Sequence, residues 1–261
     1  MKSDRLRLLL CCLAAPLAAV GGYFCTGALV NLYLERVGGE ASLLALYLFN
    51  ALEQLVCFAL PAALILSARP GRWRRALAGE ENVSFRSFSL TALLAVSATV
   101  TVTMIAVLWQ GLTGLSSPHS PLPDPQNAGE WALAMLAVAM IPALCEELLF
   151  RCVLQRALCH RLPRAGVWIA ALLFAALHRQ WDALPALLLL GLTLGWLYRR
   201  YGFGGSALLH LLYNAVVLTL SSLDAGVTPL AAALSGFLFV LALRGLLKKE
   251  EAKNEADGIG L

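Results

Sequence analysis

The stretch Cys145-Glu146-Glu147-Leu148-Leu149-Phe150-Arg151 places two carboxylates and one guanidinium inside an apolar run that extends over residues 131–158. Each such charge costs roughly 2.5–3.5 kcal/mol at the centre of a lipid bilayer. The neighbouring side chains of the run are apolar and cannot offset this cost, so partners must come from elsewhere in the chain. We interpret the stretch as the centre of a buried reactive site. A purely structural ion network is the alternative interpretation.

The two glutamates of this stretch point in different directions on a helix. Glu147 and Arg151 are four residues apart with the acid first, which is the favourable order for an ion pair along one helix face. Glu146 is rotated by about 100° from Glu147, given 3.6 residues per turn. We expect Glu147 and Arg151 to neutralise each other, which leaves Glu146 as the better candidate for chemistry.

The composition indicates an integral membrane protein. Of the 261 residues, 59% are hydrophobic and only 14% are charged, whereas a soluble protein is near 25% charged. The mean hydropathy is +0.74. A bundle of membrane-spanning helices is therefore the expected all-α architecture. The net charge of +4 is weak evidence for a nucleic-acid partner, and we predict none.

Eight apolar segments suggest about eight transmembrane helices, because most of them approach the roughly 20 residues that cross 30 Å of hydrocarbon. The fifth and sixth are short and meet near Asp182 and Pro185, so a tight and partly re-entrant hairpin is one interpretation of them. The eight segments are about 6–34, 41–68, 88–112, 131–158, 166–180, 183–198, 205–223 and 229–247.

The basic residues indicate the orientation in the membrane. With a cytoplasmic N-terminus, every lysine and arginine except Arg36, Arg151 and Arg179 falls in a cytoplasmic loop or terminus. This bias is the positive-inside signature, so both termini are predicted to be cytoplasmic, in a multi-pass protein of the plasma membrane. The first apolar segment is too long for the core of a cleaved signal peptide, and we interpret it as a membrane helix.

The sequence offers no convincing side-chain nucleophile. The seven cysteines include no CxxC pair and lie in or beside apolar segments, where cysteine behaves as a small hydrophobic residue. Disulfides are therefore not expected, and Cys145 has no evident activating neighbour. Ser206 and Ser235 lack the strained GxSxG setting of serine hydrolases. Water is the expected nucleophile.

Two of the four histidines lie inside apolar segments. His178 ends the sequence Phe174-Ala-Ala-Leu-His178, and His210 begins His210-Leu-Leu-Tyr-Asn214, which places Asn214 one turn along the same face. Counted from the nearest cytoplasmic arginine at about 1.5 Å per residue, Glu147, His178 and Asn214 each lie roughly 21 Å deep and His210 roughly 15 Å. Three helices thus place polar groups in one layer, although each histidine alone has a structural explanation.

This layer has the groups that peptide hydrolysis needs. Glu146 can take a proton from a water molecule, and His178 can hold that water and share the proton. His210 and Asn214 can donate hydrogen bonds to the oxyanion of a tetrahedral intermediate.

Three short patterns in this part of the chain resemble, in order and composition, the motifs of the CAAX-protease and bacteriocin-processing (CPBP) family. Its members are intramembrane endopeptidases related to the type II CAAX prenyl proteases and are often called Abi proteins. The resemblance covers about residues 131–220. The three patterns are Glu146-Glu147-x-x-x-Arg151, Phe174-x-x-x-His178 and His210-x-x-x-Asn214.

The resemblance implies a role for each motif and a division of the chain. Glu146 would activate water together with His178, Glu147 and Arg151 would support them, and His210 and Asn214 would form the oxyanion hole. The family's eight-helix fold agrees with the segment count. Residues 1–130 would hold the first three helices, 131–220 the catalytic helices, and 221–261 the last helix and a polar cytoplasmic tail. The substrate is not implied, because residues 1–130 match nothing specific.

The need for a metal is left open by the residues. The HExxH spacing of soluble zinc proteases is absent. Glu146, His178 and His210 could form a three-ligand zinc site with one open position, but Asn214 would then be the only side-chain donor to the oxyanion. We favour water activation without a required cofactor, with zinc as the alternative.

Three functional classes fit these observations. The favoured one is an intramembrane endopeptidase that cleaves a membrane-embedded or membrane-presented peptide. A catalytically silent scaffold or immunity protein would retain the polar layer for folding. A proton-coupled transporter is the third, since carboxylates and histidines inside membranes also relay protons.

Glu53 generates the first testable prediction. It lies midway along the second apolar segment, at a depth similar to that of Glu147. There it would pair with Arg151, line the substrate path together with Phe174, or face a neighbouring helix while protonated. We expect Glu53→Gln to reduce proteolysis without abolishing it. Complete loss of activity in a normally folded variant would instead move Glu53 into the catalytic set.

Overall fold

The computed structural model describes residues 2–38, 42–68, 71–81, 83–117, 122, 125–222 and 228–247. The polar tail predicted beyond residue 247 lies outside these residues. Within them the protein is helical and contains no strand, which confirms the predicted all-α class. The elements are α1 (Lys2–Arg36), α2 (Leu43–Gln54), the π-helix η1 (Leu55–Ala59), α3 (Leu60–Ser67), α4 (Arg72–Leu77), α5 (Phe85–Thr113), α6 (Ala128–Ala134), η2 (Met135–Met140), α7 (Ile141–Glu147), η3 (Leu148–Gln155), α8 (Arg156–Cys159), α9 (Ala165–Leu177), α10 (Leu184–Ser222) and α11 (Pro229–Leu247).

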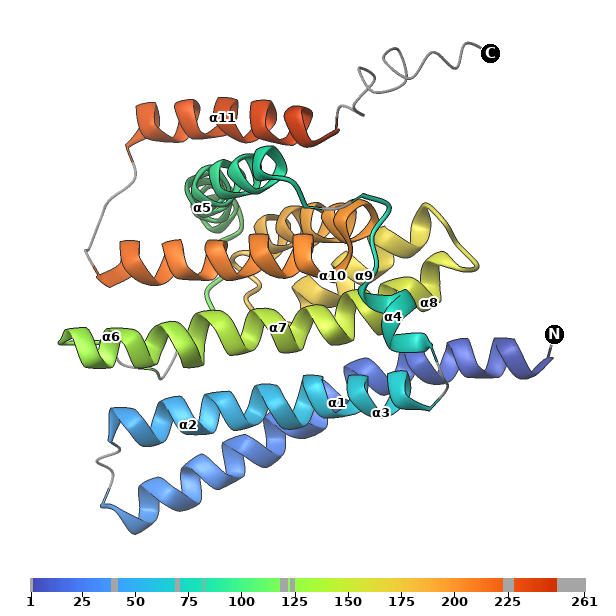
Figure 1. Ribbon diagram of the computed structural model, residues 1–261. Helices are drawn as coiled ribbons and strands as arrows, with labels where there is room; N and C mark the ends of the chain where they lie inside the picture. Colours follow the sequence, from blue (N-terminus) through green and yellow to red (C-terminus); the bar gives the residue numbers. More distant parts are fainter. Residues whose placement is uncertain are drawn as a thin grey trace.

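The helices pack side by side as a bundle. In Figure 1 the pair formed by α1 and the rod from α2 to α3 lies on one side, followed by the rod from α6 to α8, then α10, α5 and α11. The start of α1 and the end of α11 lie at the same end of the bundle, as does α4. That this end faces the cytoplasm is a prediction from the charges.

The long helices are of membrane-spanning size. Among the described residues, five helices are long and apolar enough to cross a bilayer, and α9 is a shorter apolar helix. Together they define an integral, polytopic membrane protein. Each of the eight predicted apolar segments corresponds to one helical rod or to one half of α10. The five are Leu43–Ser67, Phe85–Thr113, Ala128–Cys159, Leu184–Ser221 and Pro229–Leu246.

Local sequence signals fix several helix ends. Helix α5 begins with a capping box in which the side chains of Ser84 and Ser87 bond each other's backbone, which satisfies donors that the first turn leaves free. It ends at Gly114, whose φ of 67° is the left-handed conformation that terminates many helices. Helix α6 begins at Asn127, whose side chain accepts from the backbone of Glu130.

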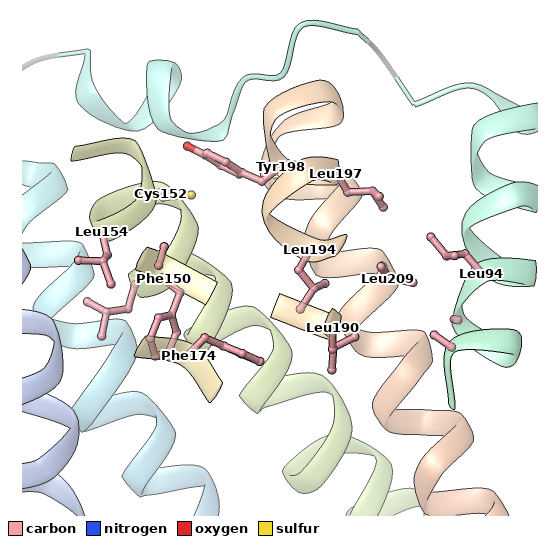
Figure 2. Close-up of a cluster of buried hydrophobic side chains, with 14 of the residues drawn as sticks. Leu94, Phe150, Cys152, Leu154, Phe174, Leu190, Leu194, Leu197, Tyr198 and Leu209 are labelled. Atoms are coloured by element: carbon pink, nitrogen blue, oxygen red, sulfur yellow. The ribbon is translucent and has the colours of Figure 1, made fainter. Parts of the chain in front are cut away.

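Helix α10 consists of two halves that meet at Gly202 and correspond to the two apolar segments predicted there. Gly202 has φ 67° and ψ −161°, a conformation open essentially to glycine alone. The chain reverses at this point, so that the halves carrying Leu194 and Leu209 lie next to each other (Figures 1 and 2). The segment after α4 packs on the turn, because Glu81 donates its backbone N–H to the carbonyl of Arg200 at 2.7 Å.

The apolar core lies between these helices and encloses the polar layer. Figure 2 shows side chains from α5, η3, α9 and both halves of α10 converging, among them Leu94, Phe150, Phe174, Leu190 and Leu209. The rings of Phe150 and Phe174 meet edge to face at 5.3 Å, a favoured aromatic geometry. The core therefore packs η3 against α9 and α10 at the level of the three sequence motifs.

The turn in α10 predicts a specific stability defect. An alanine Cβ at Gly202 would lie 2.4 Å from the carbonyl oxygen of Leu77 and 2.5 Å from the backbone nitrogen of Gly79. We expect Gly202→Ala to lower the free energy of unfolding by more than about 1–3 kcal/mol, the cost of the backbone conformation alone. Thermal unfolding in detergent micelles measures this effect.

Gly204→Ala is the matched control, since nothing lies within 4 Å of its Cβ position. It is expected to change the free energy of unfolding by about 0.5 kcal/mol or less. Equal stability of the two variants would mean that the turn at Gly202 is described wrongly.

Candidate active site

Glu146 lies at the centre of the polar layer, where three helices meet. It belongs to α7 and is 7% exposed. Its Oε2 atom lies 3.7 Å from Nε2 of His178, at the end of α9, and 3.9 Å from Nε2 of His210, in the second half of α10. This Oε2 atom is buried and has no hydrogen-bond partner within the described chain. The carboxylate thus faces two imidazole rings at a distance that leaves room for a small species between them.

Glu147 is fully buried and holds the layer together. Its Oε2 atom accepts a hydrogen bond from Nε of Arg151 at 3.1 Å, so the predicted pair along the helix is present. Its Oε1 atom lies 3.2 Å from Nδ1 of His210. One carboxylate therefore joins the helix that carries it to the second half of α10.

Arg151 is also fully buried and is enclosed on several sides. Its guanidinium lies 5.1 Å from the centre of the Phe174 ring, within the range of a cation–π interaction. Its Nη1 atom donates to Oε1 of Gln155 at 3.4 Å, whereas Nη2 has no partner within the described residues. The charge is thus compensated mainly by Glu147 and by an aromatic face.

The backbone changes its helical form directly after the two glutamates. Residues 148–155 form the π-helix η3, and residues 135–140 form a second one, η2, ahead of α7. Turns of this kind are rare and are frequent at functional sites. Here η3 carries Arg151 and Gln155, so the wider turn orients the groups that surround Glu147.

His178 has a defined hydrogen on its ring. Its Nδ1 atom lies 2.7 Å from the carbonyl oxygen of Phe174, one turn earlier. A carbonyl oxygen only accepts, so Nδ1 carries the hydrogen and donates it. In the neutral ring Nε2, which faces Glu146, is then a hydrogen-bond acceptor. His178 is 26% exposed, which makes it the more accessible of the two histidines.

Phe174 forms a wall shared by both histidines. Its ring centre lies 4.4 Å from that of His178 and 5.7 Å from that of His210, and the side chain is fully buried. Phe174 therefore packs behind the two imidazoles and sets their orientation. Its predicted place on the substrate path stays a prediction.

Asn214 and Glu53 lie at the edge of the layer. The side-chain amide of Asn214 donates to the carbonyl oxygen of Ala139 at 3.5 Å, one turn beyond His210. Glu53, in α2, is half-buried, and its charged neighbours are Arg179 and Glu146. Arg151 is engaged by Glu147 instead, so the pairing of Glu53 with Arg151 considered above is not found in the described structure.

Gln155 is a member of the site that the motifs do not contain. It is 1% exposed, and its Nε2 atom donates to the carbonyl oxygen of Gly195 at 2.7 Å, in the first half of α10. Glu147, Arg151 and Gln155 recur at intervals of four residues, the spacing of one helix face. This four-residue spacing is the sequence signal that could have predicted Gln155 as a member of the site.

The atoms that could bind zinc are Oε2 of Glu146 and the Nε2 atoms of His178 and His210. Both histidines engage their Nδ1 atoms and direct Nε2 toward Glu146, as zinc ligands with a supporting second shell do. The separations of 3.7 and 3.9 Å are wider than the roughly 3.4 Å between ligands of a tetrahedral zinc ion. Among the described residues, no group of three or more His, Cys, Asp or Glu side chains is arranged to hold a metal ion. The chemistry of the set fits zinc, and its spacing would have to contract by a few tenths of an ångström.

The fold and the layer define a class of protein. An all-α integral membrane protein that buries a carboxylate between two imidazoles inside its bundle has the features of an intramembrane hydrolase. Residues 128–216 match the family model of the type II CAAX prenyl endopeptidase Rce1-like proteins. The match contains all three motifs and confirms the family that they predicted. The matched segment is about a third of the chain, and over it the protein is similar to type II CAAX prenyl endopeptidases. No curated protein and no solved structure matches the chain.

The buried ion pair predicts a large stability effect. Removing Arg151 would leave the carboxylate of Glu147 buried with less compensation, a change that typically costs 3–5 kcal/mol. We therefore expect Arg151→Met to lower the free energy of unfolding by about that amount, measured by denaturant titration in micelles. The double variant Glu147→Gln/Arg151→Met should regain part of the loss, because no charge is then left alone. A double variant no more stable than the single one would contradict the assigned pairing.

Proposed function

We propose that this protein is an endopeptidase that hydrolyses a peptide bond of a membrane-embedded or membrane-presented substrate with a water molecule activated by Glu146 and His178. The observation that supports the proposal most is the position of Glu146 Oε2, 3.7 and 3.9 Å from the two imidazole nitrogens. The family match over residues 128–216 supports the reaction class.

The separation between Glu146 and His178 suits a bridging water. At 3.7 Å the two atoms are too far apart for a direct hydrogen bond, yet one water can bond to both of them. Nε2 of the neutral His178 accepts one hydrogen of this water, and the carboxylate of Glu146 accepts the other. The lone pair of the water oxygen is then directed away from both groups, toward the carbonyl carbon of a bound peptide.

The reaction follows from these positions. As the water oxygen bonds to the carbonyl carbon, its proton moves to Glu146 and the carbonyl electron pair moves to oxygen. Glu146 then passes the proton to the leaving nitrogen while the carbon–nitrogen bond breaks. The second hydrogen of the water stays on the new carboxyl group and is then released to the amine or to solvent, so the products are a carboxylate and an amine or its ammonium form, and Glu146 returns to its starting form.

His210 and Asn214 are the proposed donors to the oxyanion. Donation from Nε2 requires the doubly protonated ring of His210, because Nδ1 already faces Glu147 at 3.2 Å; the carboxylates of Glu146 and Glu147 would stabilise that form. In that form Nδ1 donates to Glu147, and Nε2 has a hydrogen for the oxyanion. The amide of Asn214 lies one turn away and is held only by a bond of 3.5 Å to Ala139, so it is available to a bound peptide.

We propose that the reaction requires no metal. A zinc-dependent reaction is the alternative that the following experiment tests. Glu146, His178 and His210 would hold the ion, and zinc would supply a more acidic bound water. Dialysis against a strong chelator separates the two cases. Full activity after dialysis, with no zinc detected by elemental analysis, supports the carboxylate mechanism. Loss that zinc restores would overturn it.

Replacing the proposed base tests the function directly. Glu146→Gln and His178→Asn should each lower the cleavage rate by about 10²–10⁴-fold, the usual contribution of acid–base catalysis. Comparative proteomics of cells that carry the intact protein or Glu146→Ala identifies a peptide that is cut only in the former. Cleavage of that peptide by purified protein in lipid vesicles then gives the rates.

Glu35→Gln is the matched control, because Glu35 is exposed near the end of α1, and it should leave the rate unchanged. Unchanged biological activity of Glu146→Gln, in a protein that accumulates normally, would favour the scaffold. Proton flux into vesicles that this substitution abolishes would favour the transporter. Location in the plasma membrane is part of the proposal and is tested by fractionation.

A further inference from the structure

Arg179, the residue directly after His178, has an unusual backbone. It is the single non-glycine residue with a positive φ, 56°, among those the structure describes. Its backbone N–H donates to the carbonyl oxygen of Ala176 at 3.1 Å and so closes the last turn of α9. A left-handed residue at this place is usually glycine or asparagine, since a larger side chain adds strain. The turn itself does not require an arginine, since glycine or asparagine would adopt this backbone conformation with less strain.

The guanidinium of Arg179 is held from the N-terminal helices. It lies 3.7 Å from the centre of the Tyr23 ring in α1, a close cation–π contact. The carboxyl group of Glu53, in α2, lies near enough to interact electrostatically with Arg179 and with Glu146. Arg179 therefore lies between the two helices that precede the matched family segment and the catalytic layer.

The backbone of α1 beside Tyr23 is packed tightly, while the Tyr23 side chain itself is 45% exposed. A Cβ atom at Gly22 would lie 1.6 Å from Sγ of Cys57, in η1. Helix α1 thus approaches the rod from α2 to α3 as closely as a glycine permits. The approach lies one residue before Tyr23 and, on the rod, one turn from Glu53. A shift of α1 along the bundle would move the Tyr23 ring and would also break the close contact between Gly22 and Cys57.

His178 needs such support more than the other catalytic groups. Its ring has one hydrogen bond, to Phe174 in its own helix, and it is 26% exposed. His210, by contrast, is bonded across helices to the buried Glu147 and is 3% exposed. The place of the His178 ring therefore depends on how the end of α9 is held.

We infer that Arg179 is a positioning residue for His178. Held on the ring of Tyr23 and attracted by the carboxylate of Glu53, its guanidinium fixes the last turn of α9 and thereby keeps Nε2 of His178 within reach of Glu146. The inference rests on the proposed function. It makes α1 and α2 part of the catalytic apparatus, although they lie outside the segment that matches the family.

The position of the His178 ring can be measured without any substrate. Purified protein in vesicles is treated briefly with diethyl pyrocarbonate, and modification of His178 relative to the exposed His160 is measured by mass spectrometry. In Arg179→Met and Tyr23→Leu we expect this ratio to rise at least threefold, with the melting temperature unchanged. Arg36→Met, at the exposed end of α1, is the matched control and should leave the ratio unchanged. An unchanged ratio in Arg179→Met would overturn the inference.

Kinetics on the peptide identified above separate the side chain from the backbone. Arg179→Gly keeps the turn and removes the guanidinium, so we expect kcat to fall about 10–100-fold with little change in KM, as for a catalytic group displaced by a fraction of an ångström. Arg179→Lys keeps the charge and should retain most of kcat. Full activity of Arg179→Gly, or a change confined to KM, would overturn the inference. The proposed function fails separately, if Glu146→Gln remains active.

Discussion

The burial of Glu147 constrains everything around it. Its carboxylate has no exposed surface, and an unpaired charge in such a place would cost several kcal/mol. One oxygen is satisfied by Arg151 from the following turn, and the other by His210 from a helix more than sixty residues later. Both partners must be in place for the charge to be tolerated. The fold therefore brings the second half of α10 against α7 and η3, and the turn at Gly202 makes that return possible.

The same constraint divides the work between the two adjacent glutamates. Because both oxygens of Glu147 are engaged, this residue orients His210 and is not free to act on a substrate. Glu146 is turned to the other side of the helix, and its Oε2 atom faces the Nε2 atoms of both histidines. Phe174 packs behind the two rings and blocks other orientations. The structural carboxylate of Glu147 and the proposed reactive carboxylate of Glu146 are thus adjacent in the chain and differ in the side chains that they contact.

The sequence predicts those features that local patterns encode. Apolar length gives the helices, and the interval from Glu147 to Arg151 gives their pair. The π-helical turns and the left-handed Arg179 have no comparable local signal, and the spacing that places Gln155 on the face of Glu147 does not show that its partner is Gly195. These segments are apolar on every side, so the sequence pattern does not show which face meets which neighbour. Asn214 illustrates the limit: its spacing from His210 places it on the correct face, but only packing shows that its amide meets Ala139.

The region that matches the family and the region that surrounds the site are not the same. Residues 128–216 carry every motif, yet Asn50 in α2 donates to the carbonyl oxygen of Ala137 at 2.8 Å, beside the bond made by Asn214 to Ala139. Those two amides, one from α2 and one from the second half of α10, bind carbonyl groups two residues apart within one turn of η2. Helices that carry no family motif thus pack directly on the rod that carries Glu146.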